Sequence, residues 1–164
     1  MTIEEKNGKL VIMDFNECEA YKIASRIEKD GILFYKKLKE KLSKPQIKSV
    51  IDFLIQEEEK HLKLFQDLLY DMLRNREDYD EDEDLLDSMD FGIFRTYQSI
   101  EELDKVVGDT AKALRLGLAI ENKSVVFYEA AKSLTRLEAA QKELSRIIDE
   151  EKKHKALLED MLSI

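Results

Sequence analysis

Two short motifs combine a glutamate with a histidine three residues later, and they contain the only two histidines of this 164-residue chain. The first motif is Glu58-Glu-Lys-His61 and the second is Glu151-Lys-Lys-His154. Residues i and i+3 lie one above the other on a helix, so each motif can offer a carboxylate oxygen and an imidazole nitrogen to one ion. The two motifs therefore indicate metal binding.

The motifs belong to a longer internal repeat. A shift of 93 residues places the first motif on the second, Glu28 on Glu121 and Tyr35 on Tyr128. Four carboxylates would balance two divalent ions, whereas unpaired acids in a core would each cost several kcal/mol. We expect Glu28 and Glu121 to come from the partner helices and to bridge the two ions.

Each histidine also follows a second glutamate, four residues before it, at Glu57 and Glu150. On the last helix Glu151 continues an apolar stripe, whereas the row through Glu150 reaches the charged Glu143. The predicted ligands are therefore Glu151 and, by the repeat, Glu58. Glu57 and Glu150 are predicted to be charges on the flanks of the helices.

Tyrosines and small residues share the helix faces of Glu28 and Glu121. Tyr35 and Tyr128 follow these acids by two turns. A buried phenol needs a hydrogen-bond partner, which would be either the ligand carboxylate of the opposite half or a group elsewhere in the core. Small residues stand one turn from each acid and indicate either room for a metal ion and its oxidant or close helix packing: Ala24, Gly31, Gly117 and Ser124.

The composition predicts an all-α protein. Hydrophobic residues make up 43% and charged residues 38%, with five glycines and one proline, which favours long helices. Apolar residues recur with helical spacing in four long segments, and a shorter helix is predicted within 93–107. The long segments are 16–42, 45–74, 110–134 and 137–162. Short breaks make each pair of helices an antiparallel hairpin, and a crossover at about 75–109 joins the two hairpins.

The length of the chain fits one domain with a real core. We expect residues 1–15 to form an N-terminal tail, irregular over 1–13, and residues 16–164 to form the bundle. The acidic run at 77–84 is predicted to be a solvated part of the crossover, with a lip that attracts cations as the alternative.

Charge and hydropathy exclude several classes of function. A net charge of −9 argues against binding to nucleic acid or to anionic membranes, because both need basic patches. No apolar run approaches the roughly 18–20 residues of a transmembrane helix, and the first residues show no apolar core of a signal peptide. We therefore expect a cytoplasmic protein. Cys18 is alone, so a disulfide within the chain is excluded.

Together with Phe34-Tyr35 and Phe127-Tyr128, these motifs resemble the ferritin-like superfamily, and its rubrerythrin branch in particular, over about residues 16–163. The resemblance implies a ferritin-like four-helix bundle that binds two iron ions, with manganese as an alternative because carboxylate-rich sites suit both metals better than zinc. It also implies oxidation of two ferrous ions by dioxygen or hydrogen peroxide. The implied ligands are Glu28, Glu58, His61, Glu121, Glu151 and His154.

The chain departs from the rubrerythrin pattern in two ways. Ser124 stands where rubrerythrins have a second glutamate on the third helix, which argues against their ligand-switching peroxidase cycle. A single cysteine cannot form the four-cysteine rubredoxin module, so we expect a separate electron-donor protein. We also expect a homodimer. The alternative functions are a non-catalytic metal carrier or sensor, a dimanganese catalase-like enzyme, and a structural bundle without metal.

Overall fold

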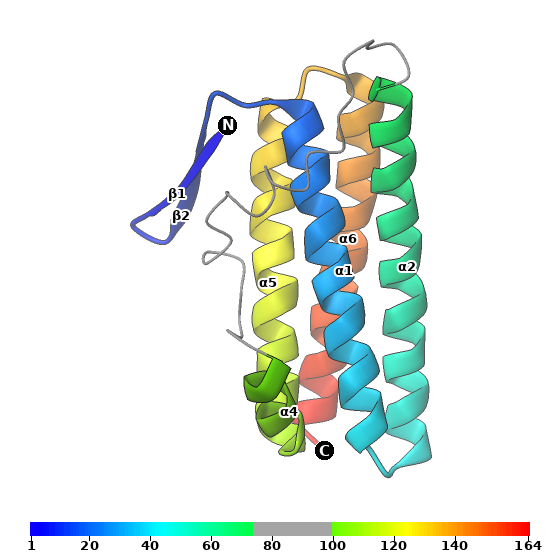
Figure 1. The fold of residues 1–164 in the computed structure, drawn as a ribbon. Helices are drawn as coiled ribbons and strands as arrows, with labels where there is room; N and C mark the ends of the chain where they lie inside the picture. Colours follow the sequence, from blue (N-terminus) through cyan, green and yellow to red (C-terminus); the bar gives the residue numbers. More distant parts are fainter. Residues whose placement is uncertain (74–99) are drawn as a thin grey trace.

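Four long helices form the bundle in the computed structural model, which describes residues 1–73 and 100–164 (Figure 1). Helix α1 packs along α2 and α5 along α6, while α1 also contacts α5 and α2 contacts α6. The predicted all-α bundle of two hairpins is confirmed. The helices are α1 (Glu17–Lys41), α2 (Pro45–Leu73), α5 (Thr110–Leu134) and α6 (Glu138–Leu162).

The helices begin where polar side chains can satisfy their first amide groups. The side chain of Asn16 accepts a hydrogen bond from the amide of Glu19 at 3.0 Å, and Asp109 accepts one from Lys112 at 3.1 Å. Pro45 occupies the first position of α2, where the lack of an N–H costs nothing. These signals explain why the predicted and observed ends agree within one residue over the described part of the chain.

A short helix, α4 (Ile100–Val107), precedes α5 and packs against α1 and α5. It covers the second part of the helix predicted within 93–107. The other predictions for the crossover, including the acidic run at 77–84, lie outside the described residues. Among the helices of the described ranges, none is long and apolar enough to cross a membrane.

The expectation of an irregular N-terminus is wrong, because two antiparallel strands occupy it. They are β1 (Thr2–Lys6) and β2 (Lys9–Met13). Asn7 and Gly8 connect them with φ angles of 54° and 72°, the positive values that a two-residue hairpin turn of this type requires. The Asn-Gly pair was therefore a signal for the hairpin as well as for a turn.

One face of the hairpin is apolar and packs on the bundle, beside one end of α5 (Figure 1). Ile3, Leu10 and Ile12 rest against the buried core of that end. The strands are short, so this burial rather than their own hydrogen bonds accounts for their stability.

The core of the bundle consists of two apolar clusters with a polar layer between them. The β-hairpin cluster includes Ile23, Phe65, Phe127 and Ile147, and the α4 cluster includes Phe34, Leu54, Leu103 and Leu158. Every long helix contributes to both clusters, so the bundle is fixed above and below the layer. The layer contains the glutamates and histidines that the repeat singled out.

Candidate metal centre

All four long helices contribute to the polar layer. Helices α1 and α5 bring one glutamate each, and α2 and α6 bring one glutamate and one histidine each. All six residues are at most 4% exposed. They continue the same helical stripes that pack the apolar clusters, so burial of those stripes draws the polar groups inward. The six residues are Glu28, Glu58, His61, Glu121, Glu151 and His154.

The six side chains form two overlapping groups. The first contains Glu28 with His61 and the second contains Glu121 with His154, and Glu58 and Glu151 belong to both. In each group one donor atom per residue lies within 4.8 Å of every other. This grouping favours Glu58 and Glu151 as the residues that the two positions share, and a bridging role for Glu28 or Glu121 stays a prediction. Helical spacing gives the face of a residue, whereas bridging depends on the distance across the bundle.

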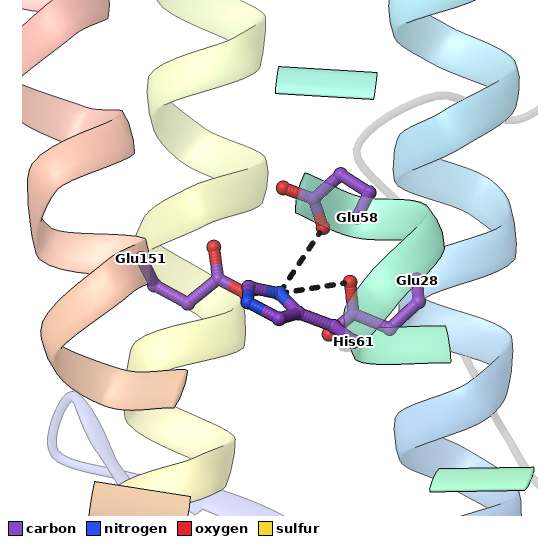
Figure 2. A group of neighbouring side chains, drawn as sticks. All are labelled: Glu28, Glu58, His61 and Glu151. Atoms are coloured by element: carbon purple, nitrogen blue, oxygen red, sulfur yellow. Dashed lines mark ion pairs between the residues drawn. The ribbon is translucent and has the colours of Figure 1, made fainter. Parts of the chain in front are cut away.

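Carboxylates from three helices surround the inner nitrogen of His61 (Figure 2). Its Nδ1 atom lies 3.0 Å from Glu151 Oε1, 3.8 Å from Glu28 Oε2 and 3.9 Å from Glu58 Oε2. Carboxylate oxygens grouped around one imidazole nitrogen in this way could bind a cation together with it.

His154 repeats this arrangement in the other half. Its Nδ1 atom lies 3.0 Å from Glu58 Oε1, 3.0 Å from Glu151 Oε2 and 3.7 Å from Glu121 Oε2. The two imidazole rings are stacked with centroids 5.7 Å apart. The two halves of the repeat therefore face each other across Glu58 and Glu151.

The donor set fits a pair of divalent ions. Three buried atoms in the layer have no hydrogen-bond partner, namely Glu58 Oε1, His61 Nδ1 and Glu151 Oε1. Each lies near an opposite charge but not in hydrogen-bonding geometry, as expected of atoms aimed at a common ion. Four carboxylates and two imidazoles are ligands that suit iron or manganese.

Burial and repulsion leave two carboxyl groups of the layer protonated more readily than usual. Burial, followed by the charge of Glu151, raises the pKa of Glu121 to about 8. Burial and the charges of Glu151 and Glu28 raise the pKa of Glu58 well above its ordinary value. At neutral pH the metal-free layer therefore lowers its charge by holding protons.

The histidines and Glu151 behave as paired charges. Burial alone would lower the pKa of His61, but Glu151 and Glu28 raise it to about 11. In the same way Glu121 and Glu151 raise the pKa of His154 to about 9. Burial opposes ionisation of Glu151, yet its hydrogen bond with His154 and its ion pair with His61 hold its pKa below the usual range. In the metal-free layer the protonated imidazoles therefore supply the positive charge that metal ions would supply.

The two tyrosines link the halves. Tyr35 Oη donates to Glu121 Oε1, and Tyr128 Oη donates to Glu28 Oε1. Of the two alternatives left open by the sequence, the hydrogen bond to the carboxylate of the opposite half is confirmed. Both phenols are fully buried, and burial and the nearby carboxylates raise their pKa values well above 10.0, so they remain protonated donors.

The sequence pattern that defines rubrerythrins matches residues 19–162. The chain belongs to the rubrerythrin family. The fold is also similar to a crystal structure of a Thermotoga maritima protein assigned as a ferritin-like diiron-carboxylate protein. That structure has a TM-score of 0.70 and 23% identity, and the alignment covers 93% of this chain and 98% of the other. None of the curated proteins compared with the chain is similar to it.

Ser124 is the position at which a departure from rubrerythrins is expected from the sequence. The buried Ser124 hydroxyl donates to the carbonyl oxygen of Ile120, one turn earlier in α5, at 3.1 Å. The structure thus provides a six-residue donor set with three residues from each half.

The small residues near Glu28 and Glu121 have different roles. A Cβ atom at Gly117 would lie 3.2 Å from Leu158 and 3.3 Å from Phe34, so this glycine allows close packing. A Cβ at Gly31 would meet only Glu58 Oε2, at 3.9 Å. Gly31 therefore keeps space beside a shared carboxylate. Close packing, one of the two alternatives weighed from the sequence, is confirmed at Gly117, whereas room for a metal ion and its oxidant stays a prediction.

One contact of the metal centre was not predicted from the sequence. Glu150, predicted to be a flank charge, places Oε2 at 2.8 Å from His61 Nε2. Its repeat equivalent, Glu57, instead pairs with Lys60 at 2.6 Å. Arg146, four residues before Glu150, was a signal that could have found this contact, because it binds the Glu150 carboxylate along the helix.

Proposed function

We propose that this member of the rubrerythrin family binds two ferrous ions in the polar layer and is a di-iron oxidoreductase. The single observation that carries the proposal is the pair of overlapping donor groups that share Glu58 and Glu151. The similar Thermotoga maritima protein is assigned as a diiron-carboxylate protein, which supports iron as the metal. Manganese is the alternative that the same donors accept.

Each side chain has a distinct role in this proposal. His61 and His154 would each hold one ion, Glu28 and Glu121 would each contribute to one position, and Glu58 and Glu151 would contribute to both. Two bound ferrous ions supply two electrons, which with two protons reduce one hydrogen peroxide to two waters or one dioxygen to hydrogen peroxide. The apolar clusters on both sides of the layer exclude bulk water from it.

The tyrosines determine which oxygen of each carboxylate stays available to an ion. Tyr128 donates to Oε1 of Glu28, which leaves Oε2 beside His61 Nδ1 at 3.8 Å. In the other half, Tyr35 donates to Oε1 of Glu121, which leaves Oε2 beside His154 Nδ1 at 3.7 Å. Because hydrogen bonds to metal ligands fix their orientation, the phenols hold both terminal glutamates ready for metal.

Repeated turnover needs a reductant that restores the ferrous state. We propose a separate electron-donor protein for this step, because the single cysteine, Cys18, cannot form a four-cysteine iron site.

The test is anaerobic loading with two equivalents of ferrous iron, followed by rapid mixing with hydrogen peroxide or air-saturated buffer. The expected result is binding of two ions and a ferric absorption band that grows faster than in buffer. His61→Ala should abolish the fast oxidation, whereas Lys63→Ala on the exposed side of α2 should not change it.

Other results would contradict this function. Full oxidation activity of the His61→Ala variant would remove the proposed centre. Binding of two ions without accelerated oxidation would indicate a metal carrier, and absence of binding would indicate a purely structural bundle.

A further inference from the structure

The outer nitrogens of the two histidines have different surroundings. His61 Nε2 lies 2.8 Å from Glu150 Oε2. Arg146 Nη1 contacts the two oxygens of Glu150 at 3.0 Å and 3.1 Å, and its Nε and Nη2 contact Glu143 Oε2 at 3.1 Å and 3.0 Å. The Glu150 carboxylate is thus held by the imidazole on its inner side and by a braced guanidinium on its outer side.

The other half lacks this arrangement because one residue of the repeat differs. The equivalent of Arg146 is Phe53, whose ring meets that of His154 edge-on at 6.4 Å between centroids. A phenyl ring cannot hold a carboxylate, and Glu57 instead pairs with Lys60. Within residues 1–73 and 100–164, carboxylates lie within ion-pair distance of Nδ1 of His154 and not of its Nε2.

This difference matters for metal binding. A neutral imidazole that binds a metal through Nδ1 must carry its proton on Nε2. A carboxylate that accepts this proton fixes the tautomer, orients the ring and makes Nδ1 a stronger ligand. In the described structure His61 has such an acceptor in Glu150, whereas His154 has an aromatic edge beside it.

We infer that the two metal positions are unequal and that Glu150, held by Arg146, is a positioning residue for His61. The position at His61 binds metal more tightly and fills first, and the position at His154 fills second and releases its ion first. This inference rests on the proposed binding of two ions. It adds an order of metal loading, which the nearly symmetric set of six ligands would not predict.

Anaerobic titration with cobalt(II), followed by its visible absorption, measures the two constants separately. The wild-type protein should bind two ions in two steps. Loss of a residue that supports a metal ligand typically costs 10–100-fold in affinity, so Glu150→Ala should weaken the first step by about 10–100-fold and leave the second unchanged. Glu57→Ala, the matched variant in the other half, should change neither step by more than about twofold.

A variant that should bind the second cobalt ion more tightly provides an independent test. Phe53 is 46% exposed, so the long side chain in Phe53→Arg can reach solvent without disturbing the core. The new guanidinium would stand four residues before Glu57, as Arg146 stands before Glu150, and should turn Glu57 toward His154 Nε2. The second cobalt step should then tighten toward the first. This test relies on a gain of affinity, so a loss of affinity caused by misfolding cannot produce the expected result.

A spectroscopic readout separates positioning from lost packing. The protein has two histidines, so the zinc-loaded protein with ¹⁵N-labelled imidazoles should give two assignable rings. The His61 Nε2 proton, hydrogen-bonded to Glu150, should resonate at lower field and exchange more slowly than that of His154. Glu150→Ala should move the His61 signal alone.

The possible failures are distinguishable. Two equal cobalt steps in the wild type, or equal losses in Glu150→Ala and Glu57→Ala, would overturn the inequality while leaving the two-ion centre intact. Binding of fewer than two cobalt ions would instead overturn the proposed function, and the inference with it.

Discussion

The polar layer and the apolar clusters on its two sides are equally buried, yet burial affects their free energies in opposite directions. Phe34 and Leu54 in the α4 cluster and Glu151 in the layer are each 0% exposed. Burial of the apolar side chains stabilises the fold, whereas each buried carboxylate loses hydration that its partners only partly replace. The comparison indicates that the layer is present for its chemistry, and that the clusters provide the stability that tolerates it.

A change of pH should give the largest difference between the layer and the clusters in their contribution to stability. Several groups of the layer titrate, whereas the apolar clusters do not. The folded state raises the pKa of Glu121 from 4.5 to about 8, of His154 from 6.5 to about 9 and of His61 from 6.5 to about 11. Between the ordinary and the raised pKa of each group, the folded protein binds more protons than the unfolded chain. The stability that these groups contribute is therefore lost as the pH rises through their raised pKa values.

Thermal melting of the metal-free protein should consequently show a midpoint that falls from about pH 5 to about pH 9. Glu151, whose pKa is lowered, contributes in the opposite direction, because its stabilisation is present above pH 4.5 and is lost in acid. Metal should bind more tightly as the pH rises and should release protons, which a dye in weakly buffered solution would detect. A metal-free midpoint that rises over this range would contradict the assignment.

Truncation within an apolar cluster should be the most destabilising substitution. Phe34 is fully buried against Gly117 and Tyr35, so Phe34→Ala should lower the free energy of unfolding by about 3–5 kcal/mol. Urea denaturation of the metal-free protein measures this change. A loss below about 1 kcal/mol would show that the α4 cluster does not provide the stability assigned to it.

An apolar replacement within the layer should have the opposite sign. Glu58 is buried, and its Oε1 atom has no hydrogen-bond partner. In the metal-free protein, Glu58→Leu should leave the free energy of unfolding unchanged or raise it by up to about 4 kcal/mol. The same variant should no longer bind two metal ions. Strong destabilisation without metal would mean that the layer is stabilising by itself, and the contrast with the clusters would fail.

Removal of one tyrosine hydroxyl should give a smaller loss. Tyr128→Phe deprives the Glu28 carboxylate of its phenol donor, and hydrogen bonds to charged groups contribute about 1.5–3 kcal/mol. Urea denaturation should show a loss of this size without metal. Tyr35→Phe is the matched control, and similar losses from both would show that the two cross-links are equivalent even though the outer environments of the histidines are not.

The fold could be predicted from the sequence largely because its signals are local. The caps at Asn16 and Asp109 and the break at Pro45 mark helix ends with a physical cause. The hairpin at residues 2–13 was missed because each strand has only five residues, too few for alternation to stand out. Its Asn7-Gly8 turn was visible, but the apolar surface that the strands pack against comes from distant helices.

The six residues of the site could be named from the 93-residue repeat, because a repeat shows which positions correspond. Their role as metal ligands stays a prediction. The repeat could not show which acids are shared, because that depends on distances between helices rather than on spacing within one. The contact between Glu150 and His61 was missed for the same reason, since the stripe analysis considered only the helix that carries Glu150.

The way the layer is divided between the two hairpins bears on the origin of the protein. Residues 17–73 carry one buried glutamate, Glu28, followed by one buried Glu-x-x-His motif, and residues 110–162 carry Glu121 and the second motif in the same order. A single hairpin paired with a second copy of itself would therefore present all six donors. The internal repeat thus has the form of a duplicated hairpin, and the two copies differ at the equivalent positions Phe53 and Arg146.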